Sequence, residues 1–416
     1  MTTLFSPTRD PRLPTPAVVR LELLLVLLVA PLLAFPPLGR PLLLFLPLVL
    51  PALWLAAPPP VTPLNGTLLL LLAAVLFSLT ASFDIAFSTP KVLGVVLGAA
   101  LFFAIVRAVR TTHALDVAVE IYAAGGGALA AIGILGTNWI GKVRALQSIA
   151  EHVPAVIRGV PGQAEGFQPN AIAGALLFFI PLQLALAIAG RRRAFSILLL
   201  LFTSTVFLLT QWRNAWLSLA VAMAAWAIWQ SHGLIRRALA AAIIVIVIGG
   251  AAVWTRAEHL AEPIVGAGLS GDVESRIELW SRAILMIEDF PFTGVGMNGF
   301  RRVMPVMYPA FLTPPDYDVA HAHNQLLQTG TDLGLPGLIG YLAVLLVVAA
   351  MLVRTWRGTG DARLRWIAAS LGAGFLAFFI FGMADAIALG AKLGVVFWAA
   401  LALAAAVDAR AREASL

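Results

Sequence analysis

The sequence predicts an all-α membrane protein that crosses the bilayer many times. Of its 416 residues, 60% are hydrophobic and only 12% are charged, whereas a soluble domain has about 25% charged residues. The mean hydropathy is +0.92, and the apolar residues form runs close to the roughly 20 residues that a helix needs to cross a bilayer. Because the chain has no cysteine, disulfides, a thiolate nucleophile and Cys-ligated zinc are excluded.

About twelve apolar runs along the chain are the predicted transmembrane helices. They are residues 17–35, 41–57, 67–83, 91–109, 115–136, 169–190, 194–210, 214–231, 236–255, 335–353, 363–384 and 391–408. The second run is short and rich in proline. No small-residue cleavage site follows the first run, so we interpret it as an uncleaved membrane helix and not as a signal peptide.

The distribution of Lys and Arg predicts that both termini are cytoplasmic. Basic residues of short loops collect on the cytoplasmic side of a membrane protein. With the N-terminus inside, the inner segments hold Arg9, Arg12, Arg20, Arg107, Arg110, Arg191, Arg192, Arg193, Arg236, Arg237, Arg354, Arg357, Arg363, Arg365, Arg410 and Arg412. The short outer loops then hold only Arg40, Lys91, Arg213 and Lys392. We attribute the net charge of +7 to this orientation in the inner (cytoplasmic) membrane, and expect no nucleic-acid partner.

A single membrane-embedded domain, residues 1–416, is expected to carry a large outer loop between its ninth and tenth helices. This loop, residues 256–334, has its own aromatic and apolar residues and is predicted to be partly helical and extracytoplasmic. Its acidic residues outnumber its arginines, so an anion would have to bind at a local arginine site. A shorter outer segment is expected at residues 137–168.

Within the large loop, the stretch "SRIELWSRAILMIED" predicts a helix over residues 275–289. Ser275 followed by Glu278 fits a capping box. One apolar face is then expected from residues at helical spacing, Ile277, Trp280, Ile284 and Ile287. Arg276 would be the first helical residue, where a cation is unfavourable unless an anion binds there. A solvated surface arginine is the alternative.

A glycine-rich stretch, "DFPFTGVGMNGFRR", follows this helix. Gly294, Gly296 and Gly299 allow a tight turn and a close approach of the backbone. The spacing is not that of a dinucleotide site, because no strand precedes it. A structural turn is the favoured interpretation.

A second arginine, Arg213 in "QWRNAW", lies in an outer turn between two apolar runs. An ionisable group at the membrane boundary is costly unless it is paired or functional. Arg213 therefore either extends to lipid headgroups or contributes to an anion site together with Arg276.

Two histidines end the loop in "VAHAHNQLLQTGTDLGLPG". A metal site at His321 and His323 is disfavoured, because residues two apart on a helix face away from each other and only Asp316 and Asp318 are near in sequence as further ligands. An imidazole with a pKa of about 6.5 suits a general base for a hydroxyl group. A histidine satisfied within a loop core is the alternative.

Taken together, these segments resemble the O-antigen ligase/polymerase family of bacterial membrane glycosyltransferases, over most of the chain. The first motif is an arginine that opens the eighth helix, here Arg213, although Trp212 and Asn214 depart from the more frequent Ser-Arg-Gly-Ala. The second is a helix followed by a glycine turn, with Arg276, Trp280, Gly294, Val295, Gly296 and Phe300. The third is His323, Asn324 and Gly334, although Leu338 departs from one form of it. The segment "GFQPNAIAG", with Asn170, also matches.

The resemblance implies transfer of a glycan from an undecaprenyl-diphosphate carrier to a hydroxyl group outside the membrane. Arg213 and Arg276 would bind the diphosphate and stabilise it as leaving group, and His323 would deprotonate the acceptor. The other implied substrate-binding residues are Asn324, Trp280, Asn170, Gly296 and His321. The family implies inverting transfer with no metal and no cofactor, within membrane lipids.

The acceptor stays open: a lipid core for a ligase, a growing glycan for a polymerase, or Ser/Thr of a protein for a protein O-oligosaccharyltransferase. A transporter is a less favoured alternative, because it predicts charged residues at mid-helix and related halves. Here no repeat is visible, and the acids fall near helix ends, namely Asp84, Asp116, Glu120 and Asp385. A purely structural protein would not explain arginines on the outer side.

Overall fold

The computed structural model describes residues 60–137, 167–231, 269–312 and 318–414, together with a few isolated residues outside these ranges. Within the described residues every regular element is helical, and the only strand-like pairing is a single bridge between Thr137 and Phe167. The predicted runs 17–35, 41–57 and 236–255 lie outside the described residues, as does most of the segment 137–168.

The described helices follow the predicted runs closely. They are α3 (Asn65–Ser78) with the 3-10 turn η1 (Leu79–Ala81), α4 (Ile85–Ala108), α5 (Thr112–Gly136), α7 (Pro169–Leu176), α8 (Ile180–Ala189), α9 (Arg193–Leu209), α10 (Arg213–Gln230), α13 (Leu269–Asp289), α14 (Phe300–Met307), α15 (Gln325–Gly358), α16 (Ala362–Phe381) and α17 (Gly394–Glu413). The sixth run is split into α7 and α8. Helix α4 begins before the predicted residue 91, because Asp84 caps it by accepting from the Phe87 N–H at 3.0 Å.

Six of the described segments are long and apolar enough to cross a membrane. They are Ile85–Ala108, Thr112–Gly136, Pro169–Ala189, Gln325–Gly358, Ala362–Phe381 and Gly394–Glu413, and Asn65–Ala81 and Arg193–Leu209 are shorter apolar helices. The chain is therefore a multi-pass membrane protein with an all-helical fold in its described parts.

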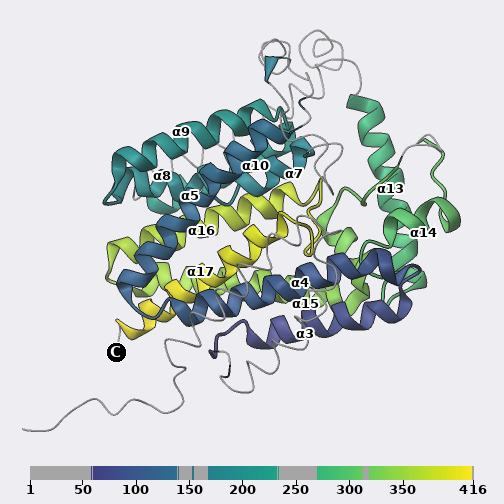
Figure 1. The fold of residues 1–416 in the computed structure, drawn as a ribbon, viewed down its shortest axis with the longest axis horizontal. Coiled ribbons are helices and arrows are strands. Elements are labelled where there is room, and N and C mark those ends of the chain that lie inside the picture. The colour runs from purple at the N-terminus through teal and green to yellow at the C-terminus, as the bar shows by residue number, and fades with distance from the viewer. Residues whose placement is uncertain are drawn as a thin grey trace, which may run out of the picture.

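The bundle packs α3 against α15, α4 against α17, and α10 against α16. Helices α3, α4, α15 and α17 run side by side, and the C-terminus lies at one end of the bundle (Figure 1). Helices α13 and α14, which belong to the predicted outer loop, lie at the opposite end (Figure 1). This end is called the site end below, and the end with the C-terminus is called the arginine-rich end.

Helix α15 contains a sharp kink at Gly334, whose φ of 66° and ψ of −172° are not helical. A Cβ at this position would lie 2.7 Å from the carbonyl oxygen of Pro291, so the close approach and the positive φ both require glycine. The Leu335 N–H donates to that same carbonyl at 2.7 Å. The straight part of α15 after the kink thus begins at residue 335, as predicted, but residues 325–333 of the expected loop are helical.

The predicted capping box at Ser275 is wrong. Helix α13 begins at Leu269, so Ser275 lies within it and Arg276 is not the first helical residue. Glu278 instead accepts from the backbone N–H groups of Phe311 and Leu312. Because residues before Ser275 continue the helix, the argument for an anion at a helix N-terminus no longer applies to Arg276.

The predicted apolar face of α13 is also not the buried one. Ile277 and Ile284 are exposed, whereas Leu279, Ala283 and Met286 are buried. The helix carries apolar residues on two faces, and helical spacing alone did not distinguish which of them packs inward.

Candidate active site

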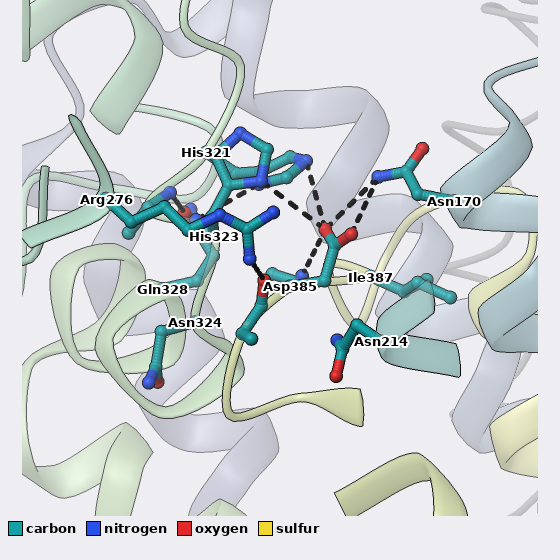
Figure 2. Close-up of polar contacts among 12 residues, drawn as sticks. Asn170, Asn214, Arg276, His321, His323, Asn324, Gln328, Asp385 and Ile387 are labelled. Atoms are coloured by element: carbon teal, nitrogen blue, oxygen red, sulfur yellow. Dashed lines mark hydrogen bonds and ion pairs between the residues drawn. The ribbon is translucent and has the colours of Figure 1, made fainter. Parts of the chain in front are cut away.

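The site is centred on Asp385, in the segment between α16 and α17. This carboxylate is fully buried. It accepts hydrogen bonds from Asn170 Nδ2, at 3.1 and 3.2 Å to its two oxygens, and from the Ala386 N–H at 2.8 Å. His323 Nδ1 lies 3.6 Å and His321 Nε2 lies 4.0 Å from Asp385 Oδ1. The contacts therefore converge on one carboxylate (Figure 2).

The residues after His323 bind the Asp385 segment through its backbone. Asn324 caps α15 with its side-chain oxygen and donates from Nδ2 to the Met383 carbonyl at 3.0 Å. The Gln325 N–H donates to the Gly382 carbonyl at 2.6 Å, and its Oε1 accepts from the Ile387 N–H at 2.9 Å. These bonds fix the histidines and the carboxylate relative to each other.

Two further elements reach the same segment from elsewhere in the chain. Arg276 of α13 donates from its guanidinium to the Ala384 carbonyl. Asn214 of α10 donates from Nδ2 to the Phe381 carbonyl at 2.9 Å. The polar groups of Arg276 and the two histidines thus lie around Asp385, with Asn214 below (Figure 2).

The two histidines lie in a loop and not on a helix. The expectation that their side chains face away from each other, which disfavoured a metal site, is therefore wrong. His323 has a φ of +49°, and this left-handed conformation turns its ring back toward His321. The ring centroids are 4.3 Å apart at an interplanar angle of 61°. The Ala322 N–H between them donates to Gln328 Oε1 at 2.8 Å and so anchors the loop to α15.

The contacts assign a tautomer to each imidazole. His321 Nδ1 accepts from the His323 N–H at 3.3 Å, so the proton of a neutral His321 is on Nε2. His323 Nδ1 is buried and faces Asp385, with no other hydrogen-bond partner in the described part of the chain. A proton on Nδ1 directed at the carboxylate leaves Nε2 of His323 as a free base.

Electrostatics favour a charged carboxylate beside neutral imidazole. Burial acts to raise the pKa of Asp385, but the interaction with His323 and the charges of both histidines outweigh it and lower that pKa. Burial, with the nearby charges of His323, Lys91 and Arg276, lowers the pKa of His321 to about 4, although Asp385 opposes this. At neutral pH, His321 is therefore uncharged.

The same three groups form a possible metal-ligand set. The ligand atoms of His321, His323 and Asp385 all lie within 4.8 Å of one another, and two imidazoles with a carboxylate can hold zinc. However, His321 Nε2 carries a proton in the tautomer that its contacts assign, and Asp385 Oδ1 already accepts from Asn170 and Ala386. The hydrogen-bond pattern is that of an orienting carboxylate.

The remaining predicted site residues lie in three different settings. Arg213 begins α10, is exposed, and makes no hydrogen bond or ion pair within the described residues. Trp280 is partly buried, and its indole N–H lacks an acceptor among them. Gly296, with a φ of +87°, packs against Ser82, where a Cβ would lie 2.7 Å from Cα. The structure thus brings together Asn170, Arg276, His321, His323 and Asn324, and places the start of α10 beside them.

Asp385 is the residue that sequence reasoning missed. Its partners Asn170, His321 and His323 are far from it in sequence, so no local pattern marked it. The available signal was an acid between two long apolar runs, because an ionisable residue near membrane depth is functional by default.

The comparison with protein-family models is consistent with this geometry. Residues 197–342 match the model described as O-antigen ligase. The matched segment contains Arg213, Arg276 and His323, whereas Asn170 and Asp385 lie outside it. A comparison with curated proteins gives no match. Over residues 197–342, the chain is thus similar to the O-antigen ligase family.

Proposed function

We propose that this membrane protein transfers a glycan from an undecaprenyl-diphosphate carrier to an acceptor hydroxyl group on the extracytoplasmic face. The observation that carries the proposal is that His323 Nδ1 lies 3.6 Å from the buried carboxylate of Asp385, while Arg276 donates to the carbonyl of the adjacent Ala384. A base, a group that orients it, and a cation for a leaving diphosphate are the components that this reaction needs.

The chemistry follows from these roles. His323 Nε2 removes the proton of the acceptor hydroxyl, and the oxygen forms a bond to the anomeric carbon as the bond from that carbon to the diphosphate oxygen breaks. The electron pair leaves on the diphosphate, whose added negative charge Arg276 and Arg213 stabilise. Asp385 stabilises the imidazolium that forms. Because the displacement is single, the anomeric configuration is inverted, and no metal or cofactor takes part.

A lipid carrier fits the surroundings of the site. A cavity of about 430 Å³ lies between α10, α15 and α16 and is lined mostly by apolar and aromatic side chains, among them Trp226, Leu345 and Phe375. The site ends of these same helices carry Asn214, Asn324 and Phe381. An isoprenoid chain in this cavity would lie along the three helices whose site ends carry these residues.

The orientation of the chain completes the proposal. We place the arginine-rich end on the cytoplasmic side of the inner membrane and residues 256–334 in the periplasm or extracellular space. From the Lys and Arg distribution, both termini are proposed to be cytoplasmic as well. Ion pairs such as Arg363–Asp116 and Arg354–Asp408 collect at the arginine-rich end. The site end would then meet glycan that has already been carried across the membrane.

The test is glycan transfer by the purified protein in lipid nanodiscs, with an undecaprenyl-diphosphate-linked glycan as donor. Arg213→Ala, Arg276→Ala and His323→Ala should each abolish transfer while the protein still reaches the membrane. Full transfer by His323→Ala would remove the general base, and full transfer by both arginine variants would remove the diphosphate site.

The acceptor separates a ligase from the alternatives in the same family, a polymerase and a protein O-oligosaccharyltransferase. Deleting the gene should leave long glycan on the carrier if a ligase is lost. Short glycan on the normal acceptor would identify a polymerase, and loss of glycan from protein would identify the protein-modifying enzyme.

A further inference from the structure

Lys91 is one of the few basic residues that the predicted topology places on the outer side of the membrane. The proposed mechanism gives it no role. It lies in α4 on the same face as Phe87 and Ser88, which precede it by four and three residues. The Arg302 guanidinium lies 4.6 Å from the centroid of the Phe87 ring, and the Ser88 hydroxyl lies 2.5 Å from that of Ser82. On this face of α4, Phe87 is therefore in contact with Arg302 of α14, and Ser88 with a residue that precedes α4.

The backbone of Lys91 also touches the segment that carries Asp385. A Cβ on Gly390 would lie only 1.8 Å from the Lys91 carbonyl oxygen, so α4 and this segment are in direct contact. Gly390 follows Asp385 by five residues. The backbone of Lys91 therefore lies beside the segment that carries Asp385.

The ammonium group of Lys91 has no hydrogen bond and no ion pair within 4.0 Å anywhere in the described part of the chain. Asp332 is the acid that acts on it at longer range, but Asp332 already accepts from the Asn298 N–H at 3.1 Å and from Gln328 Nε2 at 2.9 Å. Lys91 and Arg276 both act electrostatically on His321. The charges of two cations from different helices therefore both act on this imidazole.

We propose that Lys91 is a further substrate-binding residue, whose ammonium group binds a phosphate oxygen of the donor diphosphate. This inference rests on the proposed function. A cation without a direct partner in the described part of the chain can bind an added anion, and the donor diphosphate is the anion that the proposed reaction brings to this site. The diphosphate gains negative charge as the glycan leaves, so a third cation favours departure of the leaving group.

The experiment measures binding of glycan-free undecaprenyl diphosphate to the full-length protein in nanodiscs. Lys91→Met should weaken binding about tenfold or more. Lys91→Arg, which keeps the charge, should recover most of the affinity. Unchanged affinity in Lys91→Met would overturn the proposal.

A structural role for Lys91 as counter-ion of Asp332 is separated by a second pair of variants. If Lys91 only offsets the charge of Asp332, then Asp332→Asn combined with Lys91→Met should restore binding, which would also overturn the proposal. If the diphosphate is the partner, the double variant should bind as weakly as Lys91→Met. Arg276→Met, measured in parallel, tests the proposed function itself. Weak binding by Arg276→Met together with normal binding by Lys91→Met would reject the role of Lys91 and leave the proposed function standing.

Discussion

Two buried aspartates at opposite ends of the bundle have contrasting surroundings. Asp408, at the arginine-rich end, is 1% exposed and pairs with Arg354 at 2.8 Å and with Arg412 at 2.7 Å. Asp385, at the site end, is also buried, but its hydrogen-bond donors are the Asn170 amide and the Ala386 N–H. Its nearest ionisable neighbours are the two histidines.

The difference indicates which charges maintain the fold and which are available for chemistry. At the arginine-rich end, carboxylates and guanidinium groups neutralise one another and join α15 to α17. At the site end, Arg276 donates to the Ala384 carbonyl, and the groups around Asp385 are an amide, a backbone N–H and two imidazoles. A guanidinium beside an oriented imidazole is suited to an anionic substrate.

The largest expected effect on activity comes from removing the imidazole. His323→Ala should lower kcat by about 10³-fold, because general base catalysis contributes about 10²- to 10⁴-fold. The measurement is initial transfer rate at saturating donor. His321→Ala is the matched control, and its loss should be smaller, because Nε2 of His321 carries a proton in the assigned tautomer. An equal loss in both variants would contradict the assignment of the base to His323.

Replacing the orienting carboxylate should have the next largest effect. Asp385→Asn should lower kcat by about 10²-fold or more, because the amide cannot stabilise the imidazolium.

Asp408→Asn is the control for burial of an aspartate. It should lower stability by about 2 kcal/mol, since it weakens ion pairs that are partly open to solvent, and leave the rate per folded molecule unchanged. A loss of rate in Asp408→Asn as large as in Asp385→Asn would remove the contrast between the two ends.

Acidification should lower the stability of the folded protein through protonation of the buried His321. Its pKa falls from about 6.5 in an unfolded chain to about 4 in the folded protein, so the folded state binds fewer protons in this interval. Stability should therefore fall as the pH is lowered from about 6.5 to about 4, by at most about 3 kcal/mol. Thermal unfolding of His321→Gln should show a shallower loss over the same interval. An equally steep loss in the variant would assign the effect to other groups.

The smallest expected effect is that of metal removal. Treatment with EDTA or 1,10-phenanthroline should leave the transfer rate unchanged, because His323 acts as a base in this account. Inactivation by the chelator and recovery with added zinc would instead make His321, His323 and Asp385 a metal site.

The membrane helices were predictable because burial in a bilayer leaves a long apolar run for each one. Helices α5, α9, α10 and α16 begin within three residues of the predicted runs. The kink at Gly334 was not predicted, because it depends on contact with the Pro291 carbonyl of the turn after α13. The start of α13 was misplaced, since a Ser and a Glu at capping spacing also occur inside helices.

The site was predictable in part. His323, Arg276 and Asn170 were identified through residue chemistry and family resemblance, and they lie together at the Asp385 segment. Asp385 itself was missed, because what distinguishes it is burial and partners from α7 and from the loop before α15. The mutual approach of His321 and His323 was also missed, since it requires the positive φ of His323.

The most direct test of the central claim is an experimental structure of the protein with glycan-free undecaprenyl diphosphate bound. We expect phosphate oxygens within hydrogen-bond distance of both Arg213 and Arg276, and Nε2 of His323 facing the space beside the diphosphate. A diphosphate bound elsewhere, with neither arginine in contact with it and His323 turned away from it, would contradict this expectation.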